Sequence, residues 1–401
     1  MGANIVIAGG GPVGLMNALL LAREGLQITV VEAEPDVVYS PRAIAYAWPL
    51  LEALDSLDLL DDMVAAGHTT DERTWRVYQT GETLVLNHDA VKGFTPHPYS
   101  LTLGQDGLAR VLLAHLSRYP NVEILWSTKV VGVAQKDSQV LVDCEGEGGS
   151  FQLEAGWLIA ADGGRSTVRK SLGLSLEGFT WPERFIATDI AYDLGAHGWS
   201  SGYLIDPVYG AVLYKLTTDG LWRVTYSEST RLPVETVEQR IPEFMKNILP
   251  DSQDYELKHF SPYSMHQRTA STYRVGRVLL AGDSAHVTNP TSGFGLMGGL
   301  YDSFLLSETL AAVIKGGASD QLLDEYAEKR RDVYINVTAP VSTESMRICF
   351  RSDDPERLAW DLNLLREKQK NPEKMRAFLS VPAALETPSL ITGKTLRADM
   401  T

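Results

Sequence analysis

The sequence predicts a mixed α/β (α+β) fold that combines a buried parallel sheet with an antiparallel sheet and ends in helices. Short apolar runs, each followed closely by a glycine-rich turn, begin near residues 4, 157 and 277. Such runs are typical of parallel strands that are covered on both faces. Residues 185–260 instead alternate apolar and polar side chains, which is typical of antiparallel strands.

The first apolar run leads into a GxGxxG turn. Residues 4–8 read Asn-Ile-Val-Ile-Ala, and a helix is predicted over residues 14–24. Between them, Gly9 permits a tight turn, Gly11 lets the main chain approach a pyrophosphate, and Gly14 lets the helix lie close to the strand. A glycine-rich turn alone is a weak signal, because such turns also occur as purely structural features. Its position between a strand and a helix predicts a Rossmann-like dinucleotide site.

A carboxylate supports this interpretation. The next predicted strand, residues 27–31, ends at Glu32, about 20 residues beyond the glycines. Glu32 can accept hydrogen bonds from both hydroxyls of an unphosphorylated ribose, and it would repel an adenosine 2′-phosphate. We therefore expect the adenosine half of a dinucleotide to bind here.

Composition and charge exclude several classes of function. The chain has 401 residues, and 36 Lys and Arg against 51 Asp and Glu give a net charge of −15. Such an acidic surface repels nucleic acid and anionic lipid. Cys144 and Cys349 are too few for a disulfide framework and lack metal-ligand spacing. We expect a cytoplasmic protein, a monomer or homodimer, with no leader, no membrane span and no metal site.

Two later junctions between a strand and a glycine turn each carry a carboxylate. Asp162 follows the strand predicted over 157–161, and Asp283 follows the strand predicted over 277–281. Three such junctions on one sheet predict one extended cofactor, because a nicotinamide dehydrogenase would need only the first. Asp283 can accept a hydrogen bond from a polyol hydroxyl; the alternative is that it caps the following helix.

The residues after Asp283 favour a flavin. Pro290, Gly293 and Gly295 precede a long apolar helix predicted over 297–314. Glycines let main-chain N–H groups come near a ring edge at a helix N-terminus, where the field favours an anion. A reduced flavin carries negative charge around N1 and the C2 carbonyl, so this arrangement would help it accept a hydride from a nicotinamide.

The substrate side is predicted from the β-rich segments. Residues 73–100 contain two alternating runs around a Thr-Gly-Glu turn, which indicates a hairpin. Most aromatic side chains of residues 181–261 are expected in the core, but some can line a pocket for a flat ligand. The pocket candidates are Tyr203, Tyr214, Trp222 and Tyr226. No catalytic residue can be chosen from the sequence.

These motifs resemble a known family. The GxGxxG turn, combined with Asp162-Gly163 and with the run Gly282-Asp283-Ser284-Ala285-His286, is similar to the single-component FAD-dependent aromatic hydroxylases. This is the group of para-hydroxybenzoate hydroxylase, phenol hydroxylase and the hydroxyphenylpropionate hydroxylases. The resemblance covers about residues 3–345 and is especially close over 268–283. We expect no counterpart of the thioredoxin-like C-terminal domain that the longer members carry.

The resemblance implies roles for individual residues. Arg42 and Gln105 match positions that contact FAD, and Asp162 belongs to a motif that serves both FAD and the passing NAD(P)H. Asp283 matches the aspartate that binds the ribityl chain, whereas His286 has a structural role. Two positions depart from the family pattern: Met297 replaces an asparagine near the flavin, and Asp302-Ser303 replaces Asp-Ala.

The reaction implied is hydroxylation of a phenolic or heteroaromatic small molecule with NAD(P)H and O2. FAD is reduced by NADH or NADPH and then forms a C4a-hydroperoxide, whose distal oxygen goes to the ring. A flavin oxidase or epoxidase on the same scaffold is the alternative enzyme. A binding protein that keeps the FAD fold without redox work is the alternative from another class.

The resemblance also implies the domain boundaries. Residues 1–180 form the first part of a Rossmann-like FAD-binding domain, with the hairpin as an excursion, and residues 262–345 form its second part. Residues 181–261 form an antiparallel substrate domain over the flavin ring. Residues 346–401 form a helical tail that becomes loose from about residue 380.

Overall fold

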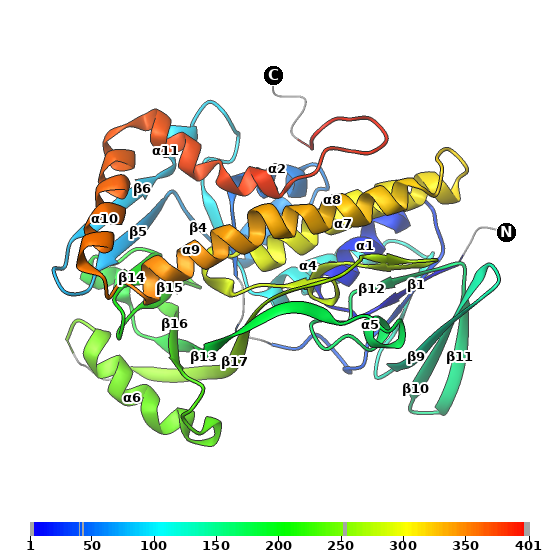
Figure 1. Cartoon of the computed structure of the whole chain (residues 1–401), viewed down its shortest axis with the longest axis horizontal. Coiled ribbons are helices and arrows are strands. Elements are labelled where there is room, and N and C mark those ends of the chain that lie inside the picture. Colours follow the sequence, from blue (N-terminus) through cyan, green and yellow to red (C-terminus); the bar gives the residue numbers. More distant parts are fainter. Residues whose placement is uncertain (1–3, 40, 42–43, 252–254, 397–401) are drawn as a thin grey trace.

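The structure is a computed structural model that describes residues 4–39, 41, 44–251 and 255–396. A six-stranded sheet lies towards one end of the molecule and an eight-stranded sheet towards the other, and a long helical layer extends along both (Figure 1). No helix among the described residues has the length and apolar character needed to cross a membrane.

The six-stranded sheet joins the three predicted glycine junctions. Its order is β18-β19-β12-β1-β2-β8, and all neighbours are parallel except the edge strand β18. Its strands are β1 (Ile5–Ala8), β2 (Ile28–Val31), β8 (Val122–Leu125), β12 (Trp157–Ala160), β18 (Arg274–Val275) and β19 (Val278–Leu280). Because β19, β12 and β1 are adjacent and parallel, their carboxyl ends and the turns that follow them meet at one edge.

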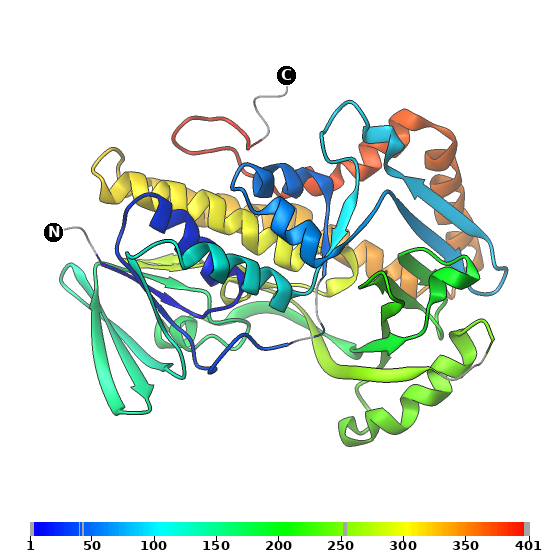
Figure 2. The same ribbon diagram turned by 180° about the vertical axis from the view of Figure 1, so that it is seen from behind.

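Helices from distant parts of the chain cover this sheet. α1 (Pro12–Arg23) packs against both α4 (Gln105–Leu116) and α7 (Phe294–Ile314), as Figure 2 shows from behind. A meander of β9 (Lys129–Lys136), β10 (Gln139–Gly146) and β11 (Gly149–Ala155) contributes Val140, Val142 and Cys144 to the same core. The short helix α5 (Thr167–Ser171) follows β12.

The eight-stranded sheet has the order β20-β17-β13-β16-β15-β14-β5-β6. Its strands are β5 (Glu72–Val77), β6 (Thr83–Asn87), β13 (Leu176–Ala191), β14 (Gly202–Ile205), β15 (Ala211–Lys215), β16 (Leu221–Ser229), β17 (Glu256–Ala270) and β20 (His286–Val287). The predicted hairpin is β5–β6, and it extends this sheet through β5, which pairs parallel with β14; the other neighbouring strands pair antiparallel.

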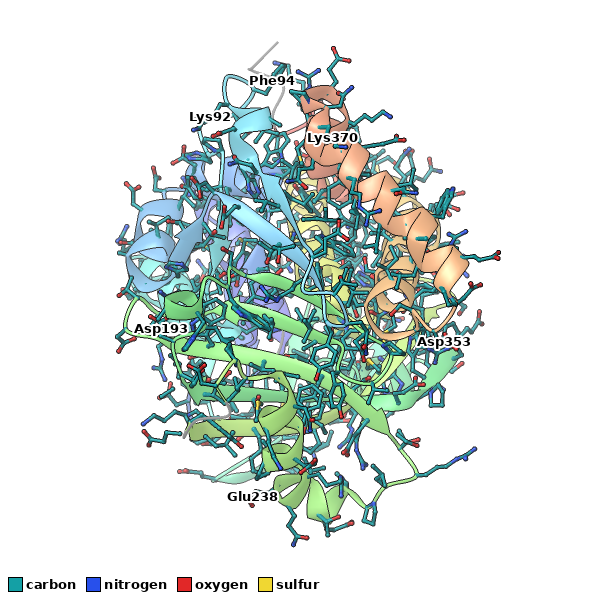
Figure 3. All side chains as sticks on the ribbon, turned by 90° about the vertical axis from the view of Figure 1, so that its left-hand side faces the viewer. Lys92, Phe94, Asp193, Glu238, Asp353 and Lys370 are labelled. Carbon is teal, nitrogen blue, oxygen red and sulfur yellow. The ribbon has the colours of Figure 1, made fainter. Side chains whose placement is uncertain are left out.

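Both faces of this sheet are packed. α6 (Val237–Ile248) covers one face, and α9 (Ala339–Phe350), α10 (Pro355–Lys370) and α11 (Pro372–Leu379) lie towards the other. Figure 3 shows this end of the molecule, with Glu238 on α6 and with Asp353 and Lys370 near the two ends of α10. A smaller sheet consists of β3 (Ala45–Tyr46), β4 (His68–Thr70) and β7 (Ser100–Thr102). Its strands, together with helices α2 (Trp48–Asp55) and α3 (Leu60–Ala66), come from the part of the chain between β2 and β8.

One helix is longer than the sequence predicts. α8 (Leu322–Val333) continues through a π-helical segment, Tyr334–Thr338, into α9, although Pro340 would ordinarily end an α-helix. The wider π turn changes the hydrogen-bond register just before Pro340, where an α-helix would place a clash. The sequence predicts a helix only near residues 321–334, so α9 is an addition that the structure makes beyond it.

The C-terminal segment is packed where a loose tail was expected. Leu385, in the 3-10 turn Val381–Leu385, is fully buried in the main core. The indole Nε1 of Trp48 donates to the carbonyl of Leu379 at 2.9 Å, and the Arg330 guanidinium donates to the carbonyl of Leu385 at 2.6 Å. The segment thus packs against the hydrophobic core that also contains β1 and α1.

Candidate active site

The first glycine turn opens onto a groove of about 560 Å³, part of which is open to solvent. The carboxylate of Glu32 accepts the N–H of Gly10 at 2.5 Å with one oxygen and the N–H of Glu34 at 2.9 Å with the other. These bonds fix Glu32 at the groove, and each oxygen retains a lone pair for a ligand hydroxyl. The groove is lined by Gly10, Gly11, Pro12, Glu32, Glu34, Asp36, Val37, Val38, Gln105, Asp106, Ala109 and Trp126.

The three motif glycines differ in what surrounds them. At Gly9, which has φ +104°, a Cβ atom would overlap the carbonyl oxygen of Ala161, and at Gly14 it would overlap the carbonyl oxygen of Gly9. At Gly11 a Cβ atom would meet nothing within 4 Å. Gly9 and Gly14 are therefore required by the protein's own packing, whereas Gly11 leaves open space for a ligand.

Asp162 lies at the carboxyl end of β12 and caps α5. Its Oδ2 accepts the N–H groups of Thr167 and Val168 at 2.7 and 3.1 Å, while its Oδ1 is buried and has no partner in the described structure. Burial raises the pKa of this carboxyl, and the N–H donors oppose the shift. A buried acceptor without a donor is costly, so Oδ1 suits a ligand hydroxyl or amide.

Asp283 lies at the third junction, on the 3-10 turn Gly282–Ser284 after β19, and its side chain is exposed. A second 3-10 turn, Pro290–Ser292, ends at Gly293 with φ +76°, from which α7 begins. The following Gly295 has room beside Thr288. These residues form the other half of the predicted cofactor site. Arg42 lies outside the described residues, and Gln105 lines the groove of the first turn.

A buried cluster supports the third junction from below. Asp302 on α7 accepts from the N–H of Gly282 at 2.9 Å, from Nε of Arg330 at 2.7 Å, and contacts Nε2 of His286 at 2.8 Å. Burial alone would raise the pKa of Asp302, but His286 and Arg330 lower it to about 2. His286 is buried and paired, in agreement with the structural role that was expected for it.

A second cavity, of about 430 Å³ including space open to solvent, lies between the eight-stranded sheet and the start of α7. One wall comes from the strands of the eight-stranded sheet, and the other comes from β3 and from the turn that precedes α7. It is lined by Ile44, Ala45, Phe185, Val212, Tyr214, Arg223, Thr225, Tyr263, Pro290, Thr291 and Gly293. Most of the lining is apolar or aromatic, as is usual for a site that holds a flat organic ligand.

The predicted pocket aromatics divide between the two faces of the sheet. Tyr214 lines the second cavity. Tyr203 lies behind it, with its hydroxyl donating to the carbonyl of Thr291 at 2.6 Å. Trp222 and Tyr226 do not line this cavity: they point to the opposite face, in the cluster around α6, where Tyr226 stacks on Phe244 at 3.8 Å between ring centroids. Strand alternation places Arg223 and Thr225, the polar residues of β16, on the cavity side.

Two charged groups beside this cavity were not predicted. Arg223 is buried and donates to both carboxylate oxygens of Asp189 at 2.7 and 2.9 Å, and the Tyr39 hydroxyl donates to the same carboxylate. Arg73, on β5, donates to the hydroxyl oxygens of Tyr203 and Tyr214 at 3.1 and 2.9 Å. Both clusters join strands that are far apart in sequence, so no local pattern could have indicated them.

Comparison with known proteins identifies the family. A family model described as "FAD binding domain" matches residues 3–340. This chain belongs to that FAD-binding family. FAD is therefore the cofactor, and NAD(P)H is the co-substrate. The groove at the first turn, the open space at Gly11 and the unpartnered Oδ1 of Asp162 fit such a dinucleotide.

Relatives of this FAD-binding enzyme are aromatic monooxygenases. It is 42% identical over 380 residues to para-nitrophenol 4-monooxygenase of Pseudomonas sp. (strain WBC-3), covering 94% of each chain. It is 40% identical over 389 residues to 6-hydroxy-3-succinoylpyridine 3-monooxygenase of Pseudomonas putida (strain DSM 28022 / S16), covering 96% of this chain and 99% of the relative. The crystal structure of p-nitrophenol 4-monooxygenase from Pseudomonas putida DLL-E4 superposes with a TM-score of 0.92 at 40% identity, covering 95% of this chain and 97% of that one. The protein is an FAD-dependent aromatic monooxygenase.

Proposed function

We propose that this monooxygenase acts on a one-ring phenol or hydroxypyridine and inserts oxygen at the ring carbon para to the hydroxyl, where that carbon carries a substituent. The names of the two relatives describe this pattern, since each gives oxygenation at a substituted carbon para to a ring hydroxyl. The observation that carries the proposal in this chain is the small aromatic-lined cavity between the sheet and the start of α7. Its aromatic and apolar lining suits a flat, substituted ring.

We also propose which residues hold FAD. Glu32 would accept the ribose hydroxyls, Gly11 would let the main chain approach the pyrophosphate, and Asp283 would accept from the ribityl chain. Pro290, Gly293 and Gly295 would lie along the ring edge at the start of α7. When bound, FAD supplies electron transfer from NAD(P)H to O2 and delivery of one oxygen atom to the substrate ring.

The protein's own contribution is to position the ring and to exclude water. Phe185, Val212 and Tyr263 supply an apolar wall, and Tyr214 and Arg223 supply polar atoms on its two sides. Tyr214 and Arg223 are cross-strand neighbours, but Tyr214 reaches towards β5 and Arg223 towards Asp189 on β13. A ring bound over Val212 and Thr225 would therefore have a hydrogen-bonding partner on either side.

The test is turnover of para-substituted phenols. With NADH or NADPH and air, 4-nitrophenol is expected to be consumed with release of nitrite, because oxygenation at the substituted carbon expels the substituent. Product analysis by chromatography separates this outcome from hydroxylation beside the hydroxyl, which would retain the nitro group. Retention of the nitro group, or NAD(P)H oxidation that yields only hydrogen peroxide with every phenol and hydroxypyridine tried, would contradict the proposal.

The FAD contacts are tested separately. Replacing Glu32 with arginine (Glu32→Arg) should lower FAD retention by about 10-fold to 100-fold, because it removes a hydrogen bond to a charged acceptor. Isothermal titration of the apoprotein with FAD measures this. An unchanged dissociation constant would remove Glu32 from the site. The cytoplasmic location and the state as monomer or homodimer remain predictions, the first supported by two free, buried cysteines.

A further inference from the structure

The guanidinium of Arg73 is a charge without an opposite partner. No carboxylate lies within ion-pair distance of it in the part of the chain that the structure describes, and its Nε atom is buried with no hydrogen-bond partner. The Nη2 atom of Arg73 donates to the hydroxyl oxygens of Tyr203 and Tyr214. The guanidinium carbon, Cζ, lies over both rings, 5.5 Å from the centroid of Tyr203 and 5.9 Å from that of Tyr214. A buried cation of this kind favours an anion nearby.

The hydrogen-bond directions then fix what Tyr214 can do. The hydroxyl oxygens of Tyr203 and Tyr214 both accept from Arg73. Tyr203 uses its own proton on the carbonyl of Thr291, so that hydroxyl is fully occupied, and burial raises its pKa despite the opposing effect of Arg73. The proton of Tyr214 has no acceptor among the described residues, and Tyr214 lines the cavity. Tyr214 therefore presents a hydrogen-bond donor to a ligand.

The lining of the cavity offers no ordinary base. Its titratable side chains, among the described residues, are Tyr214, Arg223 and Tyr263, with no histidine or carboxylate. Asp189 is behind the wall and already accepts from Arg223 and Tyr39. Several charged or titratable groups lie around Tyr214. Arg73 contacts it, Arg223 and Tyr263 line the same cavity, and Tyr203 and Cys349 lie near Arg73. One step further out, His88 interacts with Arg73, and Asp189 and Tyr39 interact with Arg223.

We propose that this cavity takes in its substrate already ionised, as a phenolate or the corresponding anion of a hydroxypyridine, and that Arg73, acting through Tyr214, selects that anion. The proposal rests on the proposed function and narrows its substrates. Tyr214 donates its proton to the ligand oxygen, and a charged oxygen accepts a stronger hydrogen bond than a neutral one. A phenol that an electron-withdrawing substituent makes acidic has already lost its proton to the solvent near neutral pH, so it presents that charged oxygen.

Arg73 is thus a positioning residue, and Tyr214 is the residue that touches the ligand. The enzyme should discriminate among phenols by their acidity as well as by their shape, because a neutral phenol offers Tyr214 a weaker acceptor than a phenolate does and must also place its own proton. A weakly acidic phenol, which is still protonated at neutral pH, should bind weakly even when it fits the cavity.

The first test is the pH dependence of binding to the oxidised, FAD-loaded enzyme without NAD(P)H. The dissociation constants of 4-nitrophenol, 4-cyanophenol and 4-chlorophenol are measured from the change in the flavin spectrum. For each ligand the affinity should rise with pH up to that ligand's own pKa and then level off, so the breakpoint should move from one ligand to the next. A single breakpoint shared by all three ligands would show that an enzyme base takes the proton, and would overturn the proposal.

The second test uses variants. Tyr214→Phe and Arg73→Met should each weaken binding of 4-nitrophenolate by about 10-fold to 100-fold, and Arg73→Lys should restore part of the loss. Binding of 4-nitrotoluene, which has no ionisable oxygen, should be the same in all of them. Arg76→Met is the matched control, since Arg76 lies on the opposite face of β5 and packs over Trp199. Equal loss for both ligands in Tyr214→Phe, or no loss for either, would overturn the proposal.

Failure of this inference and failure of the proposed function give different results. Turnover with a breakpoint common to all ligands would leave the function in place and remove the selection of anions. Binding of phenolates that depends on Tyr214 and Arg73, without turnover of any phenol, would support the selection and contradict the function. If no phenol binds at any pH, the selection of anions is wrong.

Discussion

At the scale of the residue, the glycines of the first turn have separate roles. Gly14 and Gly9 are needed by the protein, because a side chain at either would overlap a carbonyl oxygen of the main chain. Gly11 has no protein atom near the position that a Cβ would take, and its φ of −74° is open to any residue. The same motif thus contains two residues that the fold requires and one, Gly11, that we propose for the cofactor.

Alanine substitutions separate these roles. Gly11→Ala should leave the thermal midpoint of the apoprotein unchanged and reduce FAD affinity, because the methyl group occupies space that the pyrophosphate needs. Gly14→Ala should lower the thermal midpoint of the apoprotein itself. Differential scanning fluorimetry and FAD titration measure both quantities. A Gly11→Ala protein that retains FAD as the parent does would contradict the role given to Gly11.

Sequence reasoning could predict this half of the proposed site because its signals are local. The strand, the three glycines and Glu32 lie within about 30 residues, which is the span of one βαβ unit. The cluster of Arg73, Tyr203 and Tyr214 joins residues up to 141 positions apart, so it depends on which strands become neighbours. Ser303, which stands where the family pattern has alanine, also has a non-local contact. Its hydroxyl accepts from the Asn17 amide on α1 at 2.8 Å.

At the scale of the element, β16 shows what alternation can and cannot predict. Alternation correctly placed Trp222 with Tyr226, and Arg223 with Thr225, on opposite faces. It could not tell which face meets the cavity, because both faces of this sheet are packed. The aromatic residues lie against α6, and the more polar pair faces the cavity.

A pair of hydroxyl deletions tests this assignment of faces. Tyr226→Phe should leave the KM for 4-nitrophenol unchanged, since Tyr226 stacks on Phe244 away from the cavity. Tyr214→Phe should raise that KM about 10-fold or more, because it removes a hydrogen bond to a charged oxygen. Steady-state kinetics with a fixed NAD(P)H concentration measures both. Equal effects of the two substitutions would show that the faces are wrongly assigned.

The α7 helix owes part of its position to Asp302. This carboxylate is fully buried and holds the turn of the third junction through Gly282, Arg330 and His286. Its pKa of about 2 in the folded protein lies below the ordinary value of 3.8. A lowered pKa stabilises the folded state above pH 4, and the contribution is lost as the pH falls through 2.

Removing this charge should therefore be costly at neutral pH. Asp302→Asn is expected to lower the free energy of unfolding by about 3–5 kcal/mol at pH 7, because it leaves Arg330 buried without its partner. The difference from the parent should shrink as the pH falls from 4 towards 2. Urea unfolding across this range measures it, with Asp320→Asn, which removes an exposed partner of Arg274, as a control of about 0–1 kcal/mol. A difference that does not depend on pH would contradict the assignment.

At the scale of the whole molecule, the C-terminal segment completes the core. Asp354 followed by Pro355 is a typical helix start, so the sequence predicts the first helix of this segment, and Asp354 caps α10. The docking of residues 380–396 could not be predicted, because the segment has no periodic apolar pattern and its contacts are with Arg330 and the main core. Its attachment depends on partners elsewhere in the chain.

Two deletions measure the contribution of this segment. Removal of residues 381–401 should lower the free energy of unfolding by about 3–5 kcal/mol, since it exposes the site of Leu385 and takes an acceptor from the buried guanidinium of Arg330. Removal of residues 393–401 should have little effect. Chemical unfolding of the FAD-loaded proteins compares them. If both deletions unfold as the full chain does, the segment does not stabilise the fold.

The parallel pairing of β5 with β14 also affects the order in which parts of the enzyme can fold during synthesis. The six-stranded sheet carries the groove of the first turn, and four of its six strands, β1, β2, β8 and β12, precede residue 161. Only β18 and β19 come later in the chain. The substrate cavity needs β5 from near residue 72, β16 from near residue 225 and the turn at residue 290, and α9 to α11 must then cover the sheet. During synthesis, more than 100 residues are added after β6 before β14, the partner strand of β5, emerges from the ribosome. Until β14 has been made, β5 is an unpaired sheet edge. We therefore expect chaperones that shield exposed strands to bind this enzyme after β6 has been synthesised and before β14 has.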